Sequence, residues 1–187
     1  VRSAQVGDPK SPNYGYVIVD GYTFSEKRRN RALGMGMGIL DAFGERPEHP
    51  LPGEEGNDNL PPQVESAAAF RTWLEKRPWS RTWTAGSDLA TQSGHIQRLS
   101  EARRQAILEV TWDYLENVLQ NSNGLWGDLT RGGNTEPYIA LNGAHKIVLF
   151  YDRFQQPVPR AEALMDTVLE TVATTPAANV LYTYNSS

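Results

Sequence analysis

Residues 100–120 read SEARRQAILEVTWDYLENVLQ, and this stretch decides the fold class. Its apolar residues, from Ile107 to Val118, recur at the spacing of one helical face. Ser100 is a residue type that caps helix starts. The pattern predicts a helix over 101–120.

Further helices are predicted on both sides of this stretch, each from an apolar stripe bounded by capping residues, glycine or proline. They cover residues 25–43, 64–76, 85–99, 137–154 and 159–175. No convincing strand alternation accompanies them. The predicted fold class is therefore all-α, with helical hairpins packed side by side.

The chain is predicted to be a single domain over residues 1–187. Residues 1–23 form an irregular leading segment, and residues 45–62 form a long loop rich in proline, glycine and acidic residues. Three alternating glycines, Gly34, Gly36 and Gly38, weaken the first helix. They indicate either close helix packing, which is the favoured reason, or a kinked segment.

Composition excludes several classes of function. The formal net charge is −4, with both signs interspersed, so no basic surface for nucleic acid is indicated. No apolar run reaches the roughly 18 to 20 residues that a membrane span requires. The absence of cysteine removes disulfides and thiolate chemistry. The chain begins at Val1, so removal of a leader, with a periplasmic or extracellular location, stays an open expectation.

Three loop-to-helix junctions resemble those of bacterial α/α-toroid carbohydrate-active proteins of the polysaccharide-lyase kind. Their residues are Asn123–Gly127 leading into Glu136–Lys146, Leu74–Trp79 leading into Trp83–Ser87, and Tyr14–Tyr16 with Gly21 and Tyr22. The resemblance implies an (α/α) toroid. Six helices are about half of a complete toroid, so it also implies that another chain or segment completes the ring.

The resemblance implies a carbohydrate-active enzyme, and first a lyase that cleaves a uronate-containing polymer by β-elimination without a cofactor. A glycoside hydrolase on the same fold is an alternative, because the fold does not select the chemistry. A non-catalytic helical module that binds glycan or protein is another. A terpenoid cyclase is disfavoured, because neither its acidic cluster nor a zinc ligand set is found in the sequence.

Candidate catalytic residues lie at the start of the predicted helix 137–154. Tyr138, Asn142 and His145 are spaced i, i+4 and i+7, which places them on one helical face. A uronate lyase needs a base, an acid and groups that neutralise the carboxylate. Tyr138 is the expected base or acid. His145 is its partner or a group that neutralises the carboxylate, and Asn142 and Arg131 are the carboxylate ligands. The alternative is that they are polar groups satisfied within the core.

Candidate substrate-binding residues fall mainly in the predicted loops. Trp79, Trp83 and Trp126 could stack on sugar rings, and Asp128 could accept hydrogen bonds from hydroxyls. His95, on the predicted helix 85–99, could face the same cavity, although a lone histidine is more often structural or on the surface.

The sequence offers two further interpretations of its polar residues. A glycosidase would need two carboxyl groups across a cleft, for which Asp88, Asp128 and Glu136 are the candidates. No metal site is predicted, since the oxygen-rich run 54–59 does not fit an EF-hand and is expected to be a solvated loop.

Overall fold

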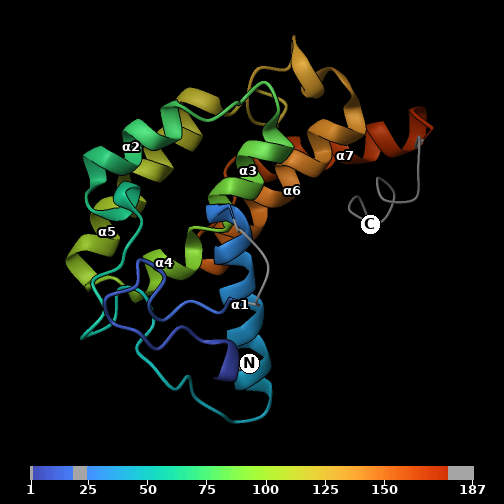
Figure 1. The fold of residues 1–187 in the computed structure, drawn as a ribbon. Helices are drawn as coiled ribbons and strands as arrows, with labels where there is room; N and C mark the ends of the chain where they lie inside the picture. The colour runs from blue at the N-terminus through green and yellow to red at the C-terminus, as the bar shows by residue number, and fades with distance from the viewer. Residues whose placement is uncertain (1, 19–24, 177–187) are drawn as a thin grey trace. The chain divides into compact units, whose positions relative to one another are not determined.

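The computed structural model describes residues 2–18 and 25–176, and these residues are mainly helical (Figure 1). The α-helices are α1 (Glu26–Ala42), α2 (Ala67–Glu75), α3 (Thr82–Ala90), α4 (Ser93–Arg98), α5 (Glu101–Asp113), α6 (Pro137–Arg153) and α7 (Ala161–Thr174). Short 3-10 helices cover Arg2–Ala4, Pro62–Val64 and Gly132–Thr135. Within these described ranges no strand forms, only the isolated bridges Gln5–Val17 and Gln120–Trp126. The all-α prediction is confirmed.

The single helix predicted over 85–99 is wrong. It is two helices, α3 and α4, separated by a turn at Thr91 and Gln92, and α3 already begins at Thr82. The β-branched Thr91, followed by Ser93 and Gly94, lowers the helix propensity at the break. Ser25 does occupy the cap position of α1 as expected, but its side chain makes no capping hydrogen bond.

The chain divides into two compact units instead of showing one continuous set of contacts. Unit 1 consists of Val1–Ala69 and Thr91–Ile107, and unit 2 consists of Phe70–Ala90 and Leu108–Ser187. Each unit is therefore built from two separate stretches of sequence.

In unit 1, amide side chains hold the long loop after α1 against the leading segment. The Gln5 amide donates to the carbonyls of Gly15 and His49 and accepts from the backbone N–H groups of Glu48 and His49 at 2.9 Å. Asn57, which is 2 % exposed, donates to the Tyr14 and Pro50 carbonyls. The expectation of a solvated loop over 54–59 is therefore wrong at Asn57.

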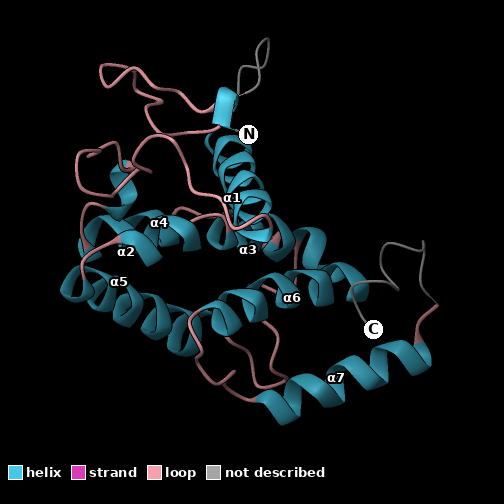
Figure 2. Ribbon diagram, turned by 90° about the horizontal axis from the view of Figure 1, so that it is seen from below, coloured by secondary structure: helices cyan, strands magenta, loops and turns pink. Residues whose placement is uncertain are grey.

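In unit 2, α6 is the central helix and packs closely against α3 (Figure 2). Glycines make this approach possible. A Cβ at Gly143 would lie 2.8 Å from Thr82 Cβ and from the Trp83 backbone nitrogen, and one at Gly86 would lie 3.2 Å from the Gly143 carbonyl oxygen. Close packing thus explains Gly86 and Gly143.

The glycines of α1 behave differently. Around Gly34 and Gly38 nothing in the described part of the chain lies within 4 Å of an added Cβ. The predicted close packing is wrong at these two positions. The exposed side of α1 carries Met35 and Ile39. In unit 2, α7 likewise exposes Met165 and Leu169.

The helix predicted over 101–120 changes character before it ends. α5 stops at Asp113, and Tyr114–Leu119 continue as a π-helix. A π-helix is wider than an α-helix and is often found at functional sites. In this chain it leads directly to the Gln120–Trp126 bridge and the glycine-rich loop beyond it.

Candidate functional site

A surface pocket of about 470 Å³ lies in unit 2, and we call it the Trp79 pocket. Its walls come from the α2–α3 connection, the π-helix and the loop after it. Its lining residues are Glu75, Arg77, Pro78, Trp79, Ser80, Tyr114, Val118, Leu119, Gln120, Asn121, Gly127, Asp128 and Arg131. Three of the residues predicted from the sequence, Trp79, Asp128 and Arg131, are therefore brought together.

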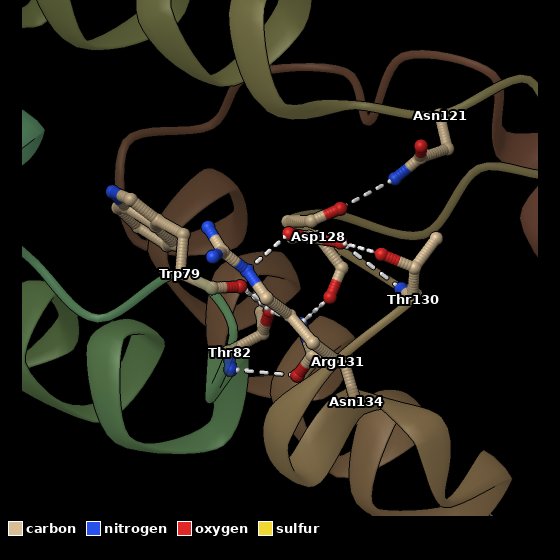
Figure 3. A network of polar contacts seen from close by, with 8 residues as sticks. Trp79, Thr82, Asn121, Asp128, Thr130, Arg131 and Asn134 are labelled. Atoms are coloured by element: carbon tan, nitrogen blue, oxygen red, sulfur yellow. Dashed lines mark hydrogen bonds and ion pairs between the residues drawn. The ribbon is translucent and has the colours of Figure 1, made fainter.

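The backbone carbonyl of Trp79 organises the base of this pocket (Figure 3). It accepts from the backbone N–H of Asp128 at 3.2 Å and from Asn134 Nδ2 at 2.8 Å. Asn134 Oδ1 in turn accepts from the Thr82 backbone N–H at 2.8 Å. These contacts tie the start of α3 to the loop that precedes α6.

Gly127 is required where this loop crosses the Trp79 carbonyl. Its φ of +90° lies in the region that favours glycine, and a Cβ there would be 2.3 Å from the Trp79 oxygen. Asn121 Nδ2 donates to the Gly127 carbonyl at 2.9 Å and so fixes the peptide from the other side. The loop is held rigidly beside the pocket.

Asp128 and Arg131 supply opposite charges on this loop. Asp128 Oδ1 accepts from the hydroxyl of Thr130 at 2.6 Å and from its backbone N–H at 3.0 Å, and Oδ2 pairs with Arg131 Nε at 2.5 Å (Figure 3). These Thr130 hydrogen bonds, with Arg131, lower the pKa of Asp128. The carboxylate therefore stays ionised at neutral pH. The Arg131 side chain is 75 % exposed and is held by Asp128 through its Nε.

A second guanidinium and a phenol complete the lining. Arg77 lies over the Trp73 ring at 4.6 Å and pairs with Asp88 at 3.6 Å. Tyr114 packs against Trp79, with ring centroids 6.1 Å apart. Burial, and then the negative charge of Glu75, raise the pKa of Tyr114, so its hydroxyl is protonated at neutral pH.

The tryptophans predicted to stack on sugars are placed differently from that expectation. Trp126 lies in a loop but is 1 % exposed, and Trp79 is 7 % exposed with its Nε1 donating to the Leu74 carbonyl. A ring so enclosed has no free face for a sugar. Trp83 is half-buried and belongs to the first turn of α3, not to a loop.

The predicted catalytic face of α6 lies outside the Trp79 pocket lining. The Tyr138 hydroxyl donates to the Thr175 carbonyl at 2.9 Å, and Asn142, fully buried, donates to the Tyr138 carbonyl at 2.6 Å. His145 is half-buried, and burial, then Lys146, lower its pKa. These contacts suit structural roles, and catalytic roles for the three residues stay predictions.

His95 belongs to unit 1, whereas the other predicted site residues belong to unit 2. It is 1 % exposed and takes part in a buried polar cluster with Tyr16 and Asn30. Burial, and then the nearby Arg98 and Arg29, lower its pKa to about 3. His95 is therefore a neutral imidazole across the physiological range.

Among the pocket residues that sequence reasoning missed are Glu75, Arg77 and Tyr114. Tyr114 was assigned to the apolar stripe of a continuous helix, because a π-helix leaves no clear mark in the sequence. Arg77 could have been predicted from the sequence, since it directly precedes Pro78 and Trp79 in the Leu74–Trp79 stretch named above.

Over residues 2–18 and 25–176, no group of three or more potential metal ligands gathers at one point. In the same ranges no helix is long and apolar enough to cross a membrane. Comparisons of the chain with protein-family models, curated proteins and solved structures find no match.

Proposed function

We propose that this chain is part of a carbohydrate-active enzyme that binds a uronate-containing glycan in the Trp79 pocket, on an (α/α) toroid or part of one. The observation that carries the proposal is the meeting of Arg131, Asp128 and Arg77 in a pocket of about 470 Å³. Cavities of roughly 300–1,000 Å³ are the usual size for small-ligand sites.

The lining suits an acidic sugar better than an apolar ligand. Guanidinium groups bind carboxylates through two parallel hydrogen bonds. Because the ion pair with Asp128 uses Arg131 Nε, the Nη groups are the donors offered to a ligand carboxylate. The Asp128 carboxylate and the Ser80 hydroxyl can exchange hydrogen bonds with sugar hydroxyls. The amide nitrogens of Gln120 and Asn121 already donate to backbone carbonyls and shape the pocket wall.

The favoured reaction is β-elimination. Arg131 would neutralise the uronate carboxylate, which acidifies the neighbouring C–H bond. The carboxylates of Glu75 and Asp128 are the bases in the pocket, and the protonated hydroxyl of Tyr114 would transfer its proton to the leaving oxygen. The Glu75–Asp128 pair also supports the alternative of a glycoside hydrolase, which uses two carboxyl groups.

A binding experiment tests the location of the site. Titration calorimetry with glucuronan and alginate oligosaccharides should show saturable binding that is lost in Arg131→Ala. The matched control is Arg153→Ala, which removes an exposed arginine at the end of α6. Unchanged binding by Arg131→Ala, or no binding of any uronate, would contradict the proposal.

Measuring turnover of the glycan distinguishes β-elimination from hydrolysis. Elimination produces an unsaturated sugar with new ultraviolet absorbance, whereas hydrolysis yields saturated ends. We expect Tyr114→Phe to abolish the absorbance change while retaining binding, and Tyr138→Phe to retain both. Loss of turnover in Tyr138→Phe alone would move the site to α6. Binding without any turnover would favour a glycan-binding module.

A further inference from the structure

Unit 1 contains a buried polar cluster that the proposed glycan site does not use. We call it the His95 cluster, and its members are Tyr16, Arg29, Asn30, His95 and Arg98. Tyr16 directly precedes Val17 of the Gln5–Val17 bridge, Arg29 and Asn30 are adjacent on α1, and the other two lie on α4. Tyr16, Asn30 and His95 are 2 %, 6 % and 1 % exposed.

The hydrogen bonds of His95 fix the orientation of Asn30. Arg98 Nη2 lies 3.3 Å from His95 Nδ1, and because a guanidinium can only donate, Nδ1 accepts. Nε2 therefore carries the proton and donates to the atom of Asn30 at 2.9 Å, which must be its oxygen. The Asn30 Nδ2 group consequently points elsewhere.

This arrangement leaves buried donors without acceptors. Asn30 Nδ2 and Arg29 Nε are both buried and have no hydrogen-bond partner among residues 2–18 and 25–176. The Tyr16 hydroxyl, 3.4 Å from the protonated His95 Nε2, accepts there and keeps its own proton for another acceptor. A buried donor left unpaired costs about 1–3 kcal/mol, so a set of them in one cluster requires an explanation.

In the described chain, the charged groups that act on Tyr16 are Arg29, Arg98 and Glu26, so two guanidinium groups face one carboxylate. Arg29 contacts the Asn13 side-chain oxygen at 2.8 Å and the Tyr16 ring at 4.8 Å, both of which are neutral. Glu26, the carboxylate nearest in sequence on α1, accepts from the amides of Gln63 and Gln92. His95 adds no compensating charge, because it is neutral.

We propose that the His95 cluster binds a small carboxylate, held by Arg29 Nε, Asn30 Nδ2 and the Tyr16 hydroxyl. A carboxylate presents only acceptors and one negative charge, which matches donors around a guanidinium. A water molecule suits these donors less well than a carboxylate, because water must also donate two hydrogen bonds. A cation would be repelled by Arg29.

The test follows the His95 ring by NMR in the full chain while sodium acetate is added at constant ionic strength. We expect a saturable shift of the His95 resonances that sodium chloride does not reproduce. Sodium glucuronate should shift them less, because a sugar ring does not fit among buried side chains. An equal effect of chloride would overturn the carboxylate assignment.

Two variants place the ligand. Asn30→Asp keeps the oxygen that accepts from His95 and supplies a negative charge of its own, and Arg29→Gln removes the guanidinium. Each should weaken acetate binding at least about tenfold, since each removes a charge-assisted contact or its charge. Arg104→Gln, which removes a surface charge from the same unit, is the control and should bind as the unaltered chain does.

Acetate binding that is unchanged in both variants, or absent in the unaltered chain, would overturn the proposal. The result is independent of the proposed glycan site. Arg131→Ala should leave the acetate response of His95 intact, so failure of either proposal is recognised separately.

Discussion

Replacing Gly127 with alanine tests whether the contacts beneath the Trp79 pocket hold unit 2 together. The added Cβ would lie 2.3 Å from the Trp79 carbonyl oxygen and 2.4 Å from Thr82 Oγ1. Real Cβ atoms do not approach other atoms within 3.0 Å. Either the loop or the start of α3 must move, and both are fixed by hydrogen bonds.

The expected loss of stability has two parts. Alanine at a left-handed φ costs about 1–2 kcal/mol. Moving the loop away from the Trp79 carbonyl also weakens the hydrogen bonds from Asp128 N and Asn134 Nδ2, at about 1 kcal/mol each. We expect the free energy of unfolding to fall by about 3–4 kcal/mol.

Urea unfolding followed by circular dichroism measures this change. Gly44→Ala is the matched control, because Gly44 also has a positive φ, of +66°, but nothing within 4 Å of its Cβ position in the described chain. It should lose only the backbone contribution, about 1–2 kcal/mol. Equal losses in the two variants would refute the packing argument. The Arg131→Ala binding defect should also appear in Gly127→Ala, because the loop carries Asp128 and Arg131.

Three further predictions concern other parts of the chain. Gly143→Ala should lower the free energy of unfolding by more than about 2 kcal/mol, because the added Cβ meets the start of α3. Gly34→Ala should raise it by about 0.5–1 kcal/mol, because its Cβ position is open. Thermal unfolding measures both, and a Gly143→Ala variant more stable than Gly34→Ala would contradict this prediction. The pKa of His95 is about 3 in the folded chain and about 6.5 when unfolded, so between these values the unfolded chain binds the extra proton. Stability should therefore fall as pH drops through this window, by up to about 1.4 kcal/mol per pH unit, and unfolding curves of His95→Gln should lack this slope. Burial, and then the Glu116 carboxylate, raise the pKa of Tyr151, so its hydroxyl should stay protonated while the folded chain is titrated with alkali. A spectrophotometric titration should therefore give the same curve for Tyr151→Phe as for the unaltered chain. Loss of one tyrosine ionisation in the variant would contradict this prediction.

The helices could be predicted from the sequence because their signals are local. Pro137 marks the start of α6, and the apolar stripe of 101–120 marks α5. The break between α3 and α4 was missed because small polar residues carry a weak periodicity. The π-helix was missed because it depends on how Tyr114–Leu119 meet the following loop, which is not a local property.

The candidate site was predicted in part, for a similar reason. Asp128 and Arg131 are three residues apart and pair locally, so their proximity follows from the sequence. The hydrogen bond between Tyr16 and His95 joins positions 79 residues apart, and no local sequence pattern predicts it. Trp126 was expected to be exposed because loops usually are, but this loop folds inward through the Gln120–Trp126 bridge.

The π-helix also sets how far the chain length can vary near the pocket. Such a segment corresponds to one extra residue inserted in an α-helix, and one residue turns a helix by about 100°. Deleting Asn117, an exposed residue within it, would therefore convert the segment to a regular α-helix and leave the residues after it in nearly the same rotational register. The Leu119 carbonyl, which accepts from Gly127 N at 2.9 Å, would keep facing its partner. Inserting one residue instead would turn the residues after it by about 100° and displace the loop that carries Asp128 and Arg131.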